Sequence, residues 1–103
     1  MSNFWDERKV EGAFITASEL QDQALEKDLE RFRLEEQRAI KYAELLGSAD
    51  GSVEMRKASA LAGVAKLDTE ISVCEAVSRH LRKQAELKAA YVSAWQTHAR
   101  LTT

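Results

Sequence analysis

The side chains of this chain that could act as nucleophiles, bases or zinc ligands are few and scattered. His80 and His98 lie 18 residues apart, and no nearby ligand accompanies either one, so we expect two surface histidines and no metal site. Cys74 and Ser78 lie four residues apart on one predicted helix, but His80 is rotated away from both. No nucleophile–base pair follows from this spacing.

The carboxylates and glycines give no catalytic arrangement either. Glu35 and Glu36 are adjacent, so they point to different faces of a helix and cannot share a proton. The four glycines form no phosphate-binding loop. We therefore expect no enzyme and no cofactor.

The basic residues of the second half are more informative. Arg79, Arg82, Lys83 and Lys88 lie close together in the sequence, and Trp95 follows. A basic face beside an aromatic ring could follow a nucleic-acid backbone and stack on its bases. The simpler interpretation is pairing between two helices, because the predicted first helix has an acidic excess of about three and the stretch after residue 52 a basic excess of about three. We favour the pairing and keep nucleic-acid contact as an alternative.

These side chains must be positioned by helices, and the longest helical pattern runs from Ser52 to Ala99. The stretch contains no proline, and its apolar residues recur three and four apart, which predicts one apolar seam close to a coiled coil. The seam residues are Val53, Ala60, Val64, Leu67, Ile71, Cys74, Leu81, Ala85, Val92, Trp95 and Ala99, with Lys57, Ser78 and Lys88 in the same register. We expect the helix to span 52–101 and to continue through Gly63, at most with a bend.

A first helix is expected over residues 16–47. Thr16 and Glu19 fit a capping box at its start, and Ser18 and Gln21 offer a competing box two residues later. Its predicted seam is Leu25, Leu29, Phe32, Glu36, Ala39, Ala43 and Leu46, in which Glu36 is the one polar residue. A second apolar flank comprises Leu34, Ile40, Tyr42 and Leu45, which indicates more than one neighbouring helix.

Residues 47–52 should form the turn between the two helices. Gly47 can close the first helix in the left-handed conformation, and Ser52 can cap the second. A turn of this length suits an antiparallel helical hairpin. The expected fold is therefore all-α, a hairpin over residues 16–103.

Residues 1–15 are expected to form an aromatic N-terminal arm that docks on other parts of the protein. Phe4 to Val10 could form two helical turns ended by Gly12. Trp5 and Phe14 make the arm too apolar for a free tail.

The two predicted helices differ in length, and this difference predicts an oligomer. Folded back from the turn, the first helix reaches only to about Leu81, so residues 82–99 need the arm or a second copy to cover them. Two helices enclose little core, and we expect a homo-oligomer, most simply a dimeric four-helix bundle. The expected interface residues are Trp5, Phe14, Leu81, Ala85, Val92, Trp95 and Ala99.

The composition points to a cytoplasmic protein with no membrane association. The 103 residues carry a net charge of −2 and contain a single cysteine, which fits a reducing compartment and a buried, unreactive Cys74. No apolar run approaches the length of a membrane span, and the first residues do not form a secretory signal.

Two segments resemble a group of small, mostly uncharacterised bacteriophage and prophage proteins. They are Ser52–Ala58 (SVEMRKA) after a glycine-containing turn, and Ala94–Leu101 (AWQTHARL) at the end of an alanine-rich helix. That group places Arg directly after the Trp, where this chain has Gln96. The resemblance implies a helical accessory to phage DNA metabolism and implies no catalytic residue.

Three functions are therefore in competition. The first is an interaction protein that oligomerises and binds an unidentified protein partner, motivated by the exposed flank of the first helix and the uncovered end of the second. The second is a nucleic-acid-binding accessory in recombination or replication, motivated by residues 79–88. The third is a phage structural or assembly protein, or an inhibitor of a host enzyme.

Overall fold

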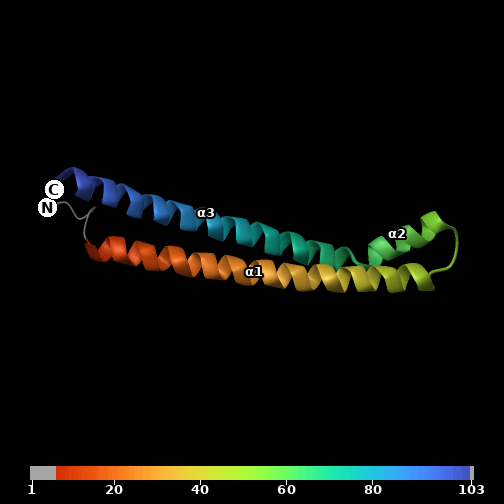
Figure 1. Ribbon diagram of the computed structural model, residues 1–103. Helices are drawn as coiled ribbons and strands as arrows, with labels where there is room; N and C mark the ends of the chain where they lie inside the picture. The colour runs from red at the N-terminus through yellow and green to blue at the C-terminus, as the bar shows by residue number, and fades with distance from the viewer. Residues whose placement is uncertain (1–6, 103) are drawn as a thin grey trace. The chain divides into compact units, whose positions relative to one another are not determined.

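The computed structural model describes residues 7–102, which form three helices (Figure 1). They are α1 (Glu7–Ser48), α2 (Val53–Gly63) and α3 (Ala65–Thr102). No strand occurs within residues 7–102. The prediction of an all-α chain is confirmed.

The chain divides into two compact units, and α1 and α3 each contribute to both. Among the described residues, unit 1 comprises residues 7–26 and 78–102, and unit 2 comprises residues 27–77. Unit 1 therefore combines the beginning of α1 with most of α3. Unit 2 combines the rest of α1 with α2 and the beginning of α3.

Helix α1 begins well before the predicted boundary at Thr16. It runs unbroken from Glu7 through Gly12, so the expected break at Gly12 and the expected capping box at Thr16 are both wrong. Val10 and Ala13 are buried in unit 1, and burial of these side chains offsets the roughly 1 kcal/mol helix-propensity cost of one glycine. Of the predicted arm, residues 1–6 with Trp5 lie outside the described residues.

The turn after α1 lies where the sequence predicts it. Helix α1 ends at Ser48, and Ser52 caps α2 by accepting a hydrogen bond at its side-chain oxygen from the Met55 backbone N–H at 3.2 Å. The left-handed residue is Gly51, with φ of 103°, whereas the predicted Gly47 stays within α1. A glycine is required at residue 51 because side chains disfavour this conformation.

The expected single long second helix is instead two helices, with a break at Val64. Val64 has φ of −106° and ψ of 6°, and its N–H donates to the carbonyls of both Ala60 and Leu61 at 3.2 Å. Gly63 lies against Leu45 of α1, and a Cβ there would collide with the Leu45 side chain. The missing side chain permits this approach and also weakens the helix, and Val64 is fully buried beside the break.

In unit 2, the inner faces of α2 and α3 are those that the seam predicts. Ala60, Val64, Ile71 and Cys74 are buried, which confirms these four positions of the seam. On the α1 side, the packed face consists of half-buried residues: three residues of the predicted second apolar flank and two arginines. They are Arg31, Leu34, Arg38, Tyr42 and Leu45.

Ion pairs join α1 to α3 in unit 2. Arg38 donates hydrogen bonds from both Nε and Nη2 to the Asp68 carboxylate, and Nη1 of Arg31 lies 3.7 Å from Oε1 of Glu75. The hydrogen bond that Arg38 donates to Asp68 raises the pKa of Arg38 above its ordinary value. The arginines belong to the helix with the acidic excess, so the pairing between helices is local and does not follow the net charges.

In unit 1, small residues bring α1 and α3 close together. Ala24 and Ala85 are almost completely buried, and so is Ser78. The Ser78 hydroxyl donates to the carbonyl of Ala24 at 3.4 Å, which satisfies this buried polar group. Alanine and serine at these positions allow two backbones to approach without large side chains between them.

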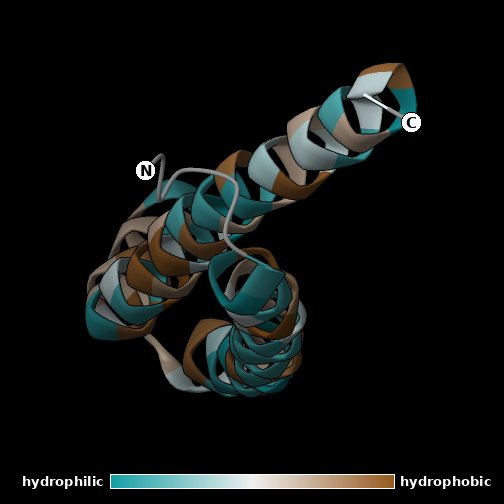
Figure 2. Cartoon of the chain, turned by 90° about the vertical axis from the view of Figure 1, so that its left-hand side faces the viewer, coloured by the Kyte–Doolittle hydropathy of each residue, from teal (hydrophilic) through white to brown (hydrophobic). Residues whose placement is uncertain are grey.

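The predicted seam of the first helix is wrong. Six of its seven residues are exposed, and only Leu46 is half-buried; the exposed ones are Leu25, Leu29, Phe32, Glu36, Ala39 and Ala43. The face that packs is rotated by about one-third of a turn, because Arg31 and Arg38 gain ion pairs there and Leu45 fits against Gly63. Figure 2 shows hydrophobic residues spread around the helices and not confined to one side of each.

Candidate functional site

The main candidate site is an exposed apolar face of α1 within unit 2. Leu29, Phe32 and Ile40 are 47%, 55% and 54% exposed. Ala39 and Ala43 are exposed on the same face, and Glu36 lies between them. We call these six residues the α1 stripe.

The Phe32 ring is held in place from one side. The guanidinium carbon of Arg31 lies 4.7 Å from the ring centroid, within cation–π range. Nη1 of Arg31 also lies 3.8 Å from a carboxylate oxygen of Glu35 and 3.7 Å from one of Glu75. These contacts fix the guanidinium and leave more than half of the Phe32 side chain accessible to a partner.

Charged residues accompany the stripe. Arg33 follows Phe32 directly, and Glu36 lies one helical turn further along; both are exposed. The two charges are opposite and lie about 60° apart around the helix axis, with Glu36 within the stripe and Arg33 at its edge, since successive residues turn by about 100°. Protein–protein interfaces commonly combine an apolar centre with a polar rim.

The interface residues that the sequence predicts lie mostly in the packed part of unit 1. Ala85 is 1% exposed, and Leu81, Val92, Trp95 and Ala99 are half-buried. The beginning of α1 belongs to the same unit, so the predicted gap beyond Leu81 is closed by residues 7–26 of the chain itself. Phe14 is the exception at 62% exposed, and Trp5 lies outside the described residues.

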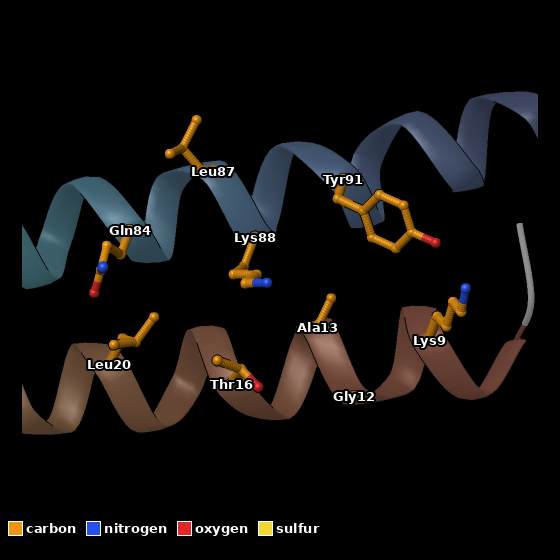
Figure 3. Close-up of a pocket in the computed structure, with 9 residues that line it drawn as sticks. All are labelled: Lys9, Gly12, Ala13, Thr16, Leu20, Gln84, Leu87, Lys88 and Tyr91. Carbon is orange, nitrogen blue, oxygen red and sulfur yellow. The ribbon is translucent and has the colours of Figure 1, made fainter. Parts of the chain in front are cut away.

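The four basic residues of the alternative function do not form one face. Arg79 and Lys83 are exposed one turn apart, while Arg82 lies beside them and donates to the side-chain oxygen of Gln21 at 3.4 Å. Lys88 lies on the opposite side of α3 from Arg79, about 180° away around the helix axis. Its side chain extends toward α1 (Figure 3).

A cleft of about 900 Å³ lies between α1 and α3 in unit 1 (Figure 3). Small residues of α1 form its floor, and Lys9 and Lys88 extend into the gap from the two helices. Tyr91 and Leu87 also line the cleft, and the end of the Leu87 side chain points away from α1. The residues that line this cleft are partly apolar and partly basic, and they do not form a convergent set of catalytic groups.

The residues first considered for chemistry are not brought together. Cys74 is 4% exposed and lines a groove of about 210 Å³ in unit 2, together with Lys27, Glu30 and Glu70. Burial raises the pKa of the Cys74 thiol, and the Glu30 carboxylate raises it further. No group of histidine, cysteine or carboxylate side chains within residues 7–102 has the arrangement of a metal site.

Comparison of the chain with protein-family models, curated proteins and solved structures finds no match. None of the helices in the described part of the chain combines the length and apolar character needed to cross a membrane. The function must therefore be argued from the surfaces themselves.

The sequence contained a signal for the α1 stripe that the prediction assigned to the wrong side. Two apolar registers run along the helix, one through Leu29 and Phe32 and one through Leu34 and Leu45. Only one of these two registers of α1 can pack against the other helices of the same chain. Gly63 marks which register packs, because Leu45 needs the space that this glycine leaves.

Proposed function

We propose that this chain is a non-enzymatic helical interaction protein that binds a protein chain through the α1 stripe. The observation that supports this proposal is the exposure of Leu29, Phe32 and Ile40 on one face of a helix whose other face is packed. Contiguous exposed apolar side chains are typical of interaction sites. Covering the exposed half of each would contribute roughly 1 kcal/mol per residue.

The proposed architecture is an antiparallel helical hairpin. Within each unit, the partner's residue number falls along α3 as it rises along α1. In unit 1 the pairs are Gln21 with Arg82 and Ala24 with Ser78, and in unit 2 they are Arg31 with Glu75 and Arg38 with Asp68. This order supports two segments that run in opposite directions.

We propose that the protein acts in the cytoplasm. A single cysteine that is buried suits a reducing cytoplasm. The resemblance to small phage and prophage proteins suggests that the partner belongs to a phage or to its host. We propose protein binding ahead of nucleic-acid binding because Lys88 points to a different side of α3 from Arg79 and Lys83.

Affinity purification from the native host tests this function. A tagged chain is expressed beside untagged copies, with and without nuclease, and compared with two variants, Phe32→Glu in the stripe and Leu87→Glu as the matched control. Leu87 is 67% exposed and lies outside the stripe. We expect the wild type and Leu87→Glu to retain the same protein chain after nuclease treatment and Phe32→Glu to lose it.

Two results would contradict the proposal. Retention of the captured chain by Phe32→Glu would show that the stripe is not the binding surface. Loss of the captured chain on nuclease treatment would favour the nucleic-acid alternative.

A further inference from the structure

We propose that the occupant of the α1 stripe is the same stripe of a second copy, packed antiparallel across a two-fold axis at the level of residue 34. This inference rests on the proposed function and names the partner at the proposed site. A two-fold interface uses one patch twice, so the patch must complement itself in both shape and charge.

The shape of the stripe satisfies this condition. Its residues recur at 29, 32, 36, 39 and 43, the alternation of threes and fours that two helices need for interlocking side chains. In the proposed register Leu29 faces the partner's Ala39, and Ala39 faces the partner's Leu29. Leu29 therefore meets a small side chain in both halves of the interface.

The charges of the stripe also complement themselves across the two-fold axis. In the same register Phe32 faces the partner's Glu36, which brings Arg33 to the level of that carboxylate. Arg33 lies at the edge of the stripe nearest to Glu36, and the two-fold axis keeps that edge on the same side in both copies, so two Arg33–Glu36 pairs form between them. This pairing explains why a carboxylate occurs within an apolar register, since a charge covered by a partner needs an opposite charge beside it.

The neighbouring register is less favourable. Moving the copies by one interlocking layer brings Glu36 opposite the partner's Ala39 and places Arg33 between the levels of the partner's Ile40 and Glu44. Glu36 would then be covered without an opposite charge beside it, which disfavours the alternative. The charges therefore select one register out of the few that the apolar spacing allows.

A charge-reversal experiment tests the pairing directly. The masses of the full chain, of Arg33→Glu, of Glu36→Arg and of an equimolar mixture of the two variants are measured by light scattering at micromolar concentration. We expect a dimer for the wild type and a dissociation constant raised about tenfold or more in each single variant, because like charges then meet across the axis. Mixing the two variants should restore a one-to-one dimer, in which every reversed residue meets an opposite charge.

Both substitutions lie at exposed positions, and circular dichroism checks that helix content is retained. A chain carrying both substitutions should also dimerise, which separates loss of pairing from loss of folding. A monomeric wild type, or a mixture that stays monomeric while the wild type dimerises, would overturn the proposal.

The same measurements separate this inference from the proposed function. A monomeric wild type whose captured chain is lost only in Phe32→Glu would keep the stripe as a site for a different protein and reject the second copy. A wild-type dimer that persists unchanged in Phe32→Glu, with no effect on capture, would reject both.

Discussion

At the scale of single residues, Gly63 and Leu45 decide how α1 meets the helix after the turn. Leu45 occupies the space where any other residue at 63 would place its Cβ. This contact selects the packed face of α1 and leaves the opposite register exposed. A residue without a side chain therefore influences which apolar face of α1 remains exposed.

Substitution of Gly63 tests this role. We expect Gly63→Val to lower the free energy of unfolding by about 1–3 kcal/mol, because the added side chain overlaps Leu45. Urea denaturation followed by circular dichroism measures the change. Gly47→Val is the matched control, since no atom lies within 4 Å of a Cβ built there. Equal effects of the two substitutions would contradict the packing argument.

The Cys74 thiol provides a second test at this scale. Because burial raises its pKa, the reactive thiolate is scarcer in the folded protein than in a free thiol at the same pH. Alkylation of the folded chain should be at least about tenfold slower than that of the urea-unfolded chain, and its rate should level off at a higher pH than that of the unfolded chain, whose rate is half-maximal at about pH 8.5. A folded-state rate that levels off at the same pH as the unfolded chain would show that the thiol is not buried.

At the scale of elements, the sequence predicts the helices and the turn but not which face of α1 packs. Ser52 as the cap of α2 and the turn after Ser48 follow from local chemistry that involves few residues. The face of α1 depends on residues far away in the sequence, such as Asp68 and Gly63, which no local pattern reveals. The stripe residues were recognisable as one apolar register, but periodicity alone could not show that they face outward.

The start of α1 illustrates the same limit. Gly12 and the Thr16 capping pattern both favour a boundary that the structure does not have, because the sequence signal omits the burial of Val10 and Ala13. Local signals compete with packing, and packing prevails when it covers two side chains for the cost of one glycine.

Replacing Gly12 distinguishes a continuous helix from a hinged arm. We expect Gly12→Ala to raise the free energy of unfolding by about 0.5–1 kcal/mol, because the residue is helical and the new methyl group meets open space. Gly51→Ala should have the opposite effect, since φ at residue 51 is 103°. Thermal unfolding of the two variants gives both signs, and no gain for Gly12→Ala would favour a break in α1 at this residue.

At the scale of the whole molecule, the composition and the exposed surfaces are the basis for proposing a protein that acts by binding. About one-third of the residues are charged and the net charge is only −2, so no general attraction to polyanions is expected. Alanine, serine and glycine supply much of the contact between helices, which leaves large apolar residues of α1 available at the surface. The expected interface at the end of α3 is occupied by the chain itself, and the α1 stripe takes its place in the proposal.

The most direct measurement of the central claim is the mass of the chain in solution, by sedimentation equilibrium at micromolar concentration. The wild type should sediment as a dimer of the 11.6 kDa chain, and Phe32→Glu should sediment as a monomer with unchanged helix content. Leu87→Glu should remain dimeric, because Leu87 lies outside the stripe. A wild type that sediments as a monomer, or a dimer that survives Phe32→Glu, would contradict the account.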